Sequence, residues 1–175
     1  MIRKFKSFEP SLGLRVYVDE QATVIGDVTL ADDTSVWPQS GIRGDINPIT
    51  IGARTNIQDG SVVHVTHASN YSEGYGCNIG SDVTVGHGCI IHACTIHDKS
   101  LIGMGSIILD GAIIETKVIV GAKSLVPSGK KLESGFLYMG SPCKQIRPLK
   151  DSEVEFLEYS ANHYVRNKDD FLQSP

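Results

Sequence analysis

The sequence of 175 residues has no long apolar run, no marked excess of positive charge and no Cys-x-x-Cys pair. A membrane-spanning helix needs about 20 consecutive apolar residues, so we expect none. Residues 1–6 are basic, but no apolar stretch or small-residue cleavage site follows, so we expect no secretory signal. The net charge of −4 argues against a broad surface for nucleic acid. These absences predict a cytoplasmic protein that binds neither membrane nor nucleic acid.

Cysteines and common catalytic motifs are also sparse. The four cysteines show no dense framework, so we expect reduced thiols: Cys77, Cys89, Cys94 and Cys143. Of these, Cys89 and Cys94 fit core positions, whereas Cys77 is expected in an exposed loop. No Gly-x-x-x-x-Gly-Lys-Ser/Thr phosphate loop and no Ser/His/Asp set stands out, and Trp37 is the single tryptophan.

A six-residue repeat of aliphatic residues runs through much of the chain. An α-helix repeats about every 3.6 residues and a strand every second residue, so this period indicates a short strand plus a turn, stacked as a parallel β-helix. A β-sandwich of short strands is the alternative, but it does not keep such strict spacing. The repeat comprises Val18, Val24, Leu30, Val36 and Ile42, then Ile51, Ile57 and Val63, then Ile79, Val85 and Ile91, and, one residue out of step, Ile96, Ile102, Ile108, Ile114, Val120 and Val126.

The pattern changes near the C-terminus, after Gly140-Ser-Pro142. From Asp151 onward, apolar residues recur at helical spacing, which predicts a helix over about 151–171 with Asp151 or Ser152 as its cap. We therefore predict two parts: a β-helix over 1–148 with a loop insertion at about 66–76, and a helix within 149–175 that packs on it.

These repeats resemble those of hexapeptide-repeat proteins. The resemblance implies an all-β core in the form of a left-handed parallel β-helix, with three hexapeptides in each triangular coil, and usually a homotrimer. On this count His64 and His92, which follow Val63 and Ile91, lie one coil apart on the same edge, separated by the strand spacing of about 4.8 Å. Arg43 is expected one coil below His64.

A second edge is predicted to carry a third histidine. Gln58 and Asp59 are expected one coil below His87, on an edge different from that of His64 and His92. A single chain cannot bring both edges to one point, but a threefold trimer can. Three histidines with an open fourth position are the ligand set of catalytic zinc, which lowers the pKa of bound water to about 7. Taken singly, each histidine is more typical of a surface or turn residue than of a metal ligand.

Longer motifs resemble the γ-class carbonic anhydrase family, in its YrdA-like branch, over about residues 10–170. They are Ile42-Arg-Gly-Asp45, Ile51-Gly-Ala-Arg-Thr-Asn-Ile-Gln-Asp-Gly-Ser61, Val62-Val-His64, Val85-Gly-His-Gly-Cys-Ile-Ile-His92 and Tyr138-Met-Gly-Ser-Pro142. The resemblance implies reversible hydration of CO₂ by a metal-bound hydroxide at the trimer interface. It also implies Zn²⁺, or alternatively Fe²⁺ or Co²⁺, on His64, His87 and His92.

The resemblance assigns further roles. Arg43, Asp45 and Asp59 correspond to interface ion pairs that order the trimer. Gln58 corresponds to the residue that orients the hydroxide, with Asn56 nearby.

Three departures from the active enzymes of this family concern proton export. Ile46 stands where those enzymes have a glutamate, and the loop at 66–76 replaces a longer acidic loop with a shuttle glutamate. Tyr138-Met-Gly140 replaces a Tyr-x-Asn motif near the site. His67 could carry protons instead, because its ordinary pKa is near 6.5, and Glu73 lies in the same loop. Both residues are also typical of a solvated loop.

The sequence leaves three other functions open. Hexapeptide trimers often act as acyltransferases that use one histidine as a base without metal. Relatives of this branch are associated with acyl-CoA pathways, so a metal-dependent thioesterase is another reading. A metal-bound accessory trimer without efficient catalysis is the third, because the glutamates for proton export are missing.

Overall fold

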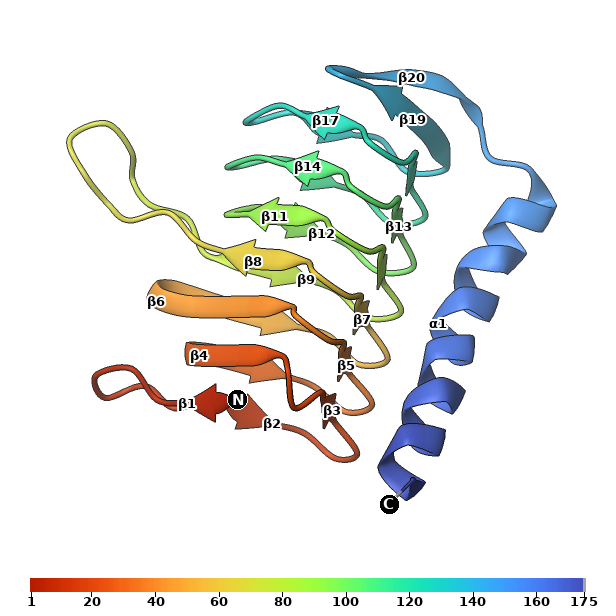
Figure 1. Ribbon diagram of the computed structural model, residues 1–175. Coiled ribbons are helices and arrows are strands. Elements are labelled where there is room, and N and C mark those ends of the chain that lie inside the picture. Colours follow the sequence, from red (N-terminus) through yellow and green to blue (C-terminus); the bar gives the residue numbers. More distant parts are fainter. Residues whose placement is uncertain (175) are drawn as a thin grey trace.

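The computed structural model describes residues 1–174 and shows a parallel β-helix flanked by one long helix (Figure 1). Its strands line three faces of a triangular prism. Face one comprises β1 (Ile2–Arg3), the first half of β4 (Thr23–Leu30), the first half of β6 (Gly41–Ile51), β8 (Val62–His64), β11 (Ile90–His92), β14 (Ile107–Ile108) and β17 (Leu125–Val126). Face two comprises β3 (Tyr17–Val18), β5 (Ser35–Val36), β7 (Asn56–Ile57), β10 (Thr84–Val85), β13 (Leu101–Ile102), β16 (Ile119–Val120), β19 (Phe136–Gly140) and β20 (Cys143–Pro148). Face three comprises β2 (Ser11–Leu12), the second halves of β4 and β6, β9 (Cys77–Ile79), β12 (Thr95–Ile96), β15 (Ile113–Ile114) and β18 (Lys131–Leu132).

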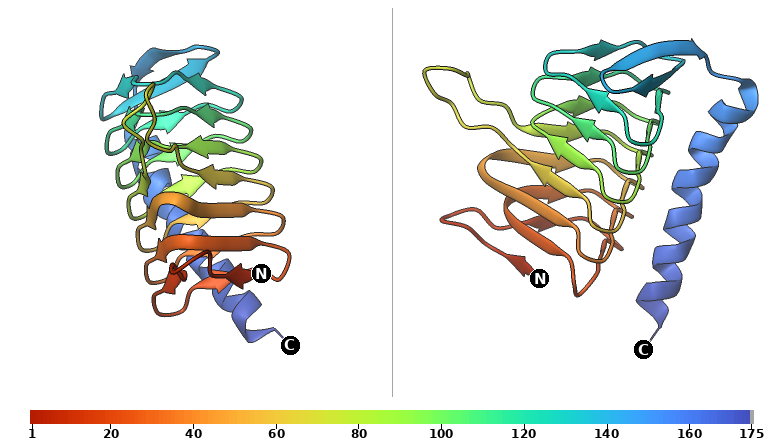
Figure 2. Two further views of the ribbon diagram at one scale, coloured as in Figure 1. Left: turned by 90° about the vertical axis from the view of Figure 1, so that its left-hand side faces the viewer. Right: turned by 45° about the horizontal axis from the view of Figure 1, so that its top comes forward.

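Faces one and three form one 12-stranded sheet because β4 and β6 run from one face to the other around a corner. Face two forms a separate 8-stranded sheet. Strands pair in parallel with the strand one coil away, as Ile96 does with Ile114. The coils therefore stack in register along the prism (Figure 2).

The interior of the prism is a narrow column of aliphatic side chains. In every predicted hexad from Val24 to Val126 the aliphatic residue is at most 3% exposed. Because side chains alternate across a strand, the residues on either side of each of these point outward. The repeat therefore determines which residues the solenoid presents on its surface.

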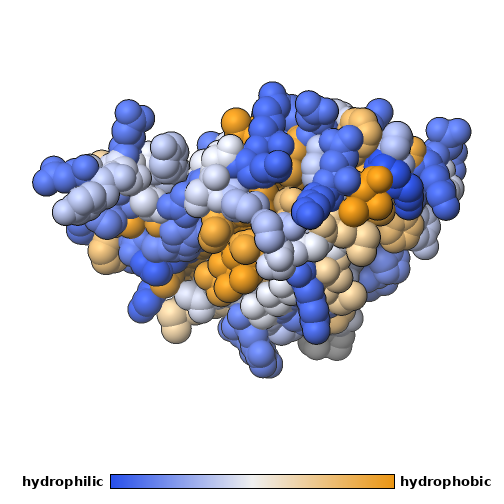
Figure 3. Space-filling view, turned by 90° about the horizontal axis from the view of Figure 1, so that it is seen from above, coloured by the Kyte–Doolittle hydropathy of each residue, from blue (hydrophilic) through white to orange (hydrophobic). Residues whose placement is uncertain are grey.

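The two ends of the solenoid differ. At the C-terminal end β19 and β20 form an antiparallel pair that closes the stack. Seen from above, apolar atoms gather in the middle of this end, among polar ones (Figure 3). Between β8 and β9 the chain leaves the prism as a hairpin of residues 66–75, held by antiparallel bridges Thr66–Tyr75 and Ser69–Ser72.

The C-terminal helix, α1, spans Asp151–Gln173. The predicted caps were wrong: Lys150 is the N-cap, and its backbone N–H donates to the Glu153 carboxylate at 2.8 Å. Glu153 also accepts two hydrogen bonds from Arg147, both at 2.7 Å. The hydrogen bonds from Arg147 and Lys150 lower the pKa of Glu153 to about 2. An ion pair between Glu153 in the first turn and Arg147 ahead of the helix therefore helps to fix where α1 begins.

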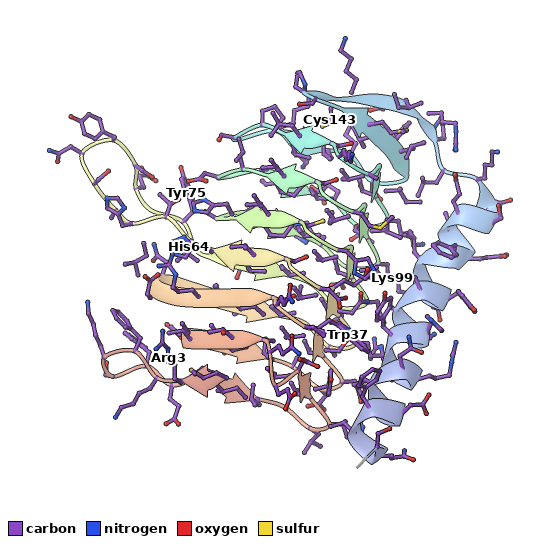
Figure 4. All side chains as sticks on the ribbon, in the orientation of Figure 1. Arg3, Trp37, His64, Tyr75, Lys99 and Cys143 are labelled. Carbon is purple, nitrogen blue, oxygen red and sulfur yellow. The ribbon has the colours of Figure 1, made fainter. Side chains whose placement is uncertain are left out.

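Helix α1 packs on face two, antiparallel to the direction in which the coils advance (Figure 1). Trp37 projects from the solenoid toward it (Figure 4) and meets the rings of Tyr164 and Phe171 at 5.5 and 5.2 Å between centroids. Farther along, the hydroxyls of Thr84 and Ser160 lie 3.0 Å apart. Helix α1 thus covers face two and leaves face one uncovered.

Beside α1, charged residues occupy corners of the coils where the backbone φ angle is positive. Arg15 donates two hydrogen bonds to Asp33, and Arg54 donates two to Asp82, each pair joining adjacent coils. Lys168 of α1 is fully buried and lies 3.0 Å from Asp33. Hydrogen bonds from Arg15 and then Lys168 outweigh the effect of burial and lower the pKa of Asp33. The last turns of α1 are therefore anchored by a buried charge.

Two expectations about the rest of the chain have clear outcomes. All four cysteines are free and buried, so the expected exposure of Cys77 was wrong. Cys77 begins β9 two residues before Ile79, and both side chains point inward. Within residues 1–174 no helix is long and apolar enough to cross a membrane.

Replacing Lys168 by Met leaves Asp33 partly buried with one cation fewer, so we expect the free energy of unfolding to fall by about 3 kcal/mol. Urea unfolding followed by far-ultraviolet circular dichroism measures the loss. Lys99→Met is the matched control, because Lys99 also faces α1, 3.9 Å from Glu158, but is 42% exposed. That change should cost less than about 1 kcal/mol. Equal losses in the two variants would contradict an anchor based on burial.

Candidate metal centre

His64 and His92 lie side by side on face one. They are paired residues of β8 and β11, and their ring centroids are 5.3 Å apart. Val63 and Ile91 point into the core with no exposed surface, so the two following imidazoles point outward. His64 sits where the projecting hairpin leaves the solenoid (Figure 4). The predicted stacking of these two histidines is confirmed.

A carboxylate lies behind each of the two rings. Asp45 accepts from His64 Nε2 at 3.0 Å, and Asp110 accepts from His92 Nδ1 at 2.6 Å. Arg43 also donates to Asp45, and the Thr66 hydroxyl donates to Asp110.

Both carboxylates have pKa values below the ordinary range. Burial would raise the pKa of each, but the hydrogen bonds from His64 and Arg43 lower that of Asp45. Those from Thr66 and His92 likewise lower the pKa of Asp110. Both groups are therefore ionised at neutral pH.

The carboxylates determine which ring nitrogens remain free. An ionised carboxylate only accepts, so His64 donates from Nε2 and His92 donates from Nδ1. In the neutral rings the remaining nitrogens, His64 Nδ1 and His92 Nε2, both carry lone pairs, and they face each other at 3.2 Å. Two imidazole nitrogens on one tetrahedral zinc, each at 2.0–2.1 Å, would be about 3.3 Å apart. The pair therefore fits two ligands of a single metal ion.

The third predicted ligand lies on a different corner. His87 Nδ1 bonds Asp59 at 2.9 Å, and both side chains are about half exposed, at 49% and 47%. The predicted position of Asp59 one coil below His87 is confirmed, since Ile57 pairs with Val85. Within residues 1–174 of one chain, no three His, Cys, Asp or Glu side chains converge as a metal site. The structure thus brings His64 and His92 together but not His87.

A line of buried polar groups runs from Gln58 to α1. Gln58 Nε2 donates to Asn56 at 3.0 Å, and Asn56 donates to the Thr84 hydroxyl at 3.2 Å. Thr84 in turn meets Ser160. Gln58 shares a cavity of about 250 Å³ with His87, Met104 and Phe156. The Gln58 amide is therefore held by Asn56 in the cavity that His87 also lines.

The remaining predicted site residues lie elsewhere or have other partners. Arg43 and His64 line a cavity of about 150 Å³ on face one. His67 is exposed at the base of the hairpin. Tyr138 is buried under the C-terminal cap, where its hydroxyl donates to Gln145 and accepts from the Glu133 N–H. None of the hydrogen bonds of Tyr138 within the described chain joins a predicted site residue, and its role stays a prediction.

Asp110 and Thr66 did not emerge from the sequence as site residues. Asp110 belongs to the coil after His92, where Ile91 pairs with Ile108, so Asp110 lies one residue beyond the position directly opposite His92. Extending the column of histidines by one coil therefore reaches Leu109, and Asp110 comes one residue later. Thr66 gave no signal, because its contact with Asp110 depends on how the hairpin leaves β8.

The fold is that of a β-helical hexapeptide-repeat protein. No family model matches the chain. Protein YrdA of Escherichia coli K12 is 57% identical over 173 residues, which are 98% of this chain and 94% of that protein. The mitochondrial gamma carbonic anhydrase 2 of Arabidopsis thaliana is 39% identical over 156 residues, 89% of this chain but 56% of that protein.

A crystal structure of a hexapeptide transferase family protein from Anaplasma phagocytophilum matches with a TM-score of 0.90 and 34% identity, covering 97% of both chains. The chain belongs to the γ-class carbonic anhydrase-like hexapeptide-repeat family, in the branch of Protein YrdA. The predicted left-handed parallel β-helix with a C-terminal helix is therefore confirmed.

Because His64 and His92 point outward, replacing either by Ala should abolish tight Co²⁺ binding while the β-helix stays folded. Equilibrium dialysis measures the bound metal, and far-ultraviolet circular dichroism measures the fold. His97→Ala is the control, since His97 is an exposed histidine just after β12 on face three, 4.0 Å from Glu115. Loss of β-structure in both ligand variants, or of metal in the control, would contradict outward-facing ligands.

Proposed function

We propose that this protein is a metal-dependent enzyme that reversibly hydrates CO₂ at a site shared by neighbouring copies in a homotrimer. The observation that carries the proposal is the His64–His92 pair, whose free nitrogens face each other at the spacing of two zinc ligands. Membership of a family that includes gamma carbonic anhydrases supports the reaction.

The proposed ligands are His64 and His92 of one chain and His87 of its neighbour. Zn²⁺ is the metal that three histidines with one open position suit best, with Fe²⁺ and Co²⁺ as alternatives. When bound there, the metal would lower the pKa of a water molecule and so supply a nucleophile near neutral pH. Asp45, Asp110 and Asp59 hold the three rings by their other nitrogens.

Two observations support an interface along face one. Val62 and Ile90 lie beside the histidine pair and are 45% and 41% exposed, an apolar stripe that a neighbouring copy would cover. His87 lies on another corner of the same chain, so its edge can meet face one only in a neighbour. A ring of three closes such a heterologous contact. Arg43, Asp45 and Asp59 would then lie at or beside the interface as its charged groups.

Within the proposed site, the chain's own residues position a small substrate. The small cavity beside Arg43 and His64 would receive CO₂ next to the histidines. The Gln58 amide, fixed by Asn56, would hydrogen-bond an oxygen of the reacting group. Ile46 is 45% exposed and cannot accept a proton. We therefore expect slow proton export, with His67 as the candidate carrier.

Stopped-flow measurement of CO₂ hydration tests the reaction. Metal-loaded protein should hydrate CO₂ faster than the buffer alone, and His92→Ala should fall to the buffer rate. The His97→Ala control should keep the full rate. If proton export is limiting, added imidazole buffer should raise the turnover. Bound metal with no hydration in any buffer would refute the assignment of CO₂ as the substrate.

Mixed trimers test the shared site. His87→Ala and His92→Ala chains should each lack complete sites alone. After subunit exchange at equal amounts they should regain about one quarter of the wild-type Co²⁺ content, because one ordered pair of neighbours in four is complete. Mixing His64→Ala with His92→Ala chains is the control, since every site then lacks one of the paired ligands. Equal recovery in both mixtures, or in neither, would contradict the proposal.

A thioesterase is the second candidate. The cavity beside His87 and Gln58 measures about 250 Å³, and apolar side chains of Leu101, Met104 and Phe156 line it. Such a space exceeds what CO₂ needs and suits an acyl chain. Hydrolysis of an acyl-CoA that is lost in His92→Ala would favour this function. Acyl transfer by metal-free protein would instead indicate an acyltransferase, and metal binding without either activity would indicate an accessory trimer.

A further inference from the structure

A chain of hydrogen bonds joins strand β6 to His92. The Asn47 amide of β6 donates to the Thr66 carbonyl at 2.6 Å. The Thr66 hydroxyl donates to Asp110, and Asp110 accepts from His92 Nδ1 at 2.6 Å. Asp45, two residues before Asn47, holds His64 directly. Both histidines are therefore oriented from the same bend of β6, one directly and one through two intermediates.

We propose that Asp110 is a positioning residue that keeps the proton of His92 on Nδ1 and so leaves Nε2 free to face His64. The inference rests on the proposed metal site for its purpose, but the tautomer itself is a property of the metal-free chain. Thr66 orients Asp110 in turn. Its hydroxyl donates a hydrogen bond to Asp110 Oδ2, which leaves Oδ1 to accept from the His92 ring.

The hydrogen-bonding capacities of these groups require this assignment. A carboxylate offers acceptors on both oxygens, so Asp110 satisfies Thr66 and His92 together. An asparagine has one accepting oxygen and a donating NH₂ group, so it matches only one of the two donors. Without the carboxylate, His92 could place its proton on Nε2, and that proton would lie in the 3.2 Å gap between His92 Nε2 and His64 Nδ1. Such partners behind a ligand are worth about 10- to 100-fold in metal affinity.

Nuclear magnetic resonance of ¹⁵N-histidine-labelled, metal-free protein tests the tautomer directly. Wild type should show His92 protonated on Nδ1, and Asp110→Asn should shift it toward the Nε2 form. Thr66→Val keeps the shape of the side chain and should produce a smaller shift in the same direction. A wild-type His92 protonated on Nε2, or an unchanged tautomer in Asp110→Asn, would overturn the inference.

Co²⁺ titration against a competing chelator gives the second readout. Asp110→Asn should weaken binding by about 10- to 100-fold and alter the visible spectrum of any bound cobalt. The matched control is Asp98→Asn. Asp98 is an exposed turn aspartate whose carboxylate accepts from the Ser81 N–H and not from His64 or His92. Asp98→Asn should change neither readout, and equal weakening in both variants would overturn a specific role for Asp110.

The outcomes separate this inference from the proposed function. If wild type shows the Nδ1 tautomer but binds no Co²⁺, the metal site fails while the positioning role of Asp110 stands. If wild type binds Co²⁺ and Asp110→Asn binds it equally well with an unchanged spectrum, the metal site stands and the positioning role fails.

Discussion

The parallel register between adjacent coils is the constraint on which the rest of this structure depends. Each strand pairs with the strand one coil away, so equivalent residues repeat at the strand spacing of about 4.8 Å. The aliphatic core residues maintain that register from inside, because each inward position must be filled. Outward side chains then form columns whose members are close enough to bond. The histidine pair, its carboxylates and the corner ion pairs are all consequences of this stacking.

The same register explains where the chain tolerates change. The hairpin at 66–75 is inserted at a corner directly after β8, and the chain returns into β9 with Ile79 paired to Ile51 as a regular coil would be. A corner insertion therefore adds a projecting segment without shifting the core. Because the hairpin starts beside His64, its first residue also reaches Asp110 and connects the insertion to the candidate metal centre.

Charged residues have different roles on two faces of the molecule. On face two, buried Lys168 and the corner aspartates anchor α1 and leave that face covered. On face one, aspartates bond the outer nitrogens of the two histidines, so that the other nitrogens face each other at 3.2 Å. That spacing suits two ligands of one metal ion. This arrangement and the exposed apolar stripe beside it are the reasons for placing the proposed site on face one.

By itself, the sequence determined the period of the solenoid, the identity of its inward residues and the columns that contain His64, His92 and His87, because a fixed hexad makes position in the fold a matter of counting. It also indicated the C-terminal helix, but not its cap, since Glu153 is held by Arg147 from outside the helix. Only the tertiary structure decided that Cys77 faces the core, that Tyr138 is buried at the capped end, and that Asp110 lies behind His92. The burial of Cys77 depends on where the hairpin returns into β9, and that of Tyr138 on the antiparallel closure of β19 and β20. The place of Asp110 depends on the turn just beyond Ile108, which pairs with Ile91. The choice of ring nitrogen depends on which neighbour each imidazole meets, and a linear pattern of residue types contains no record of that contact.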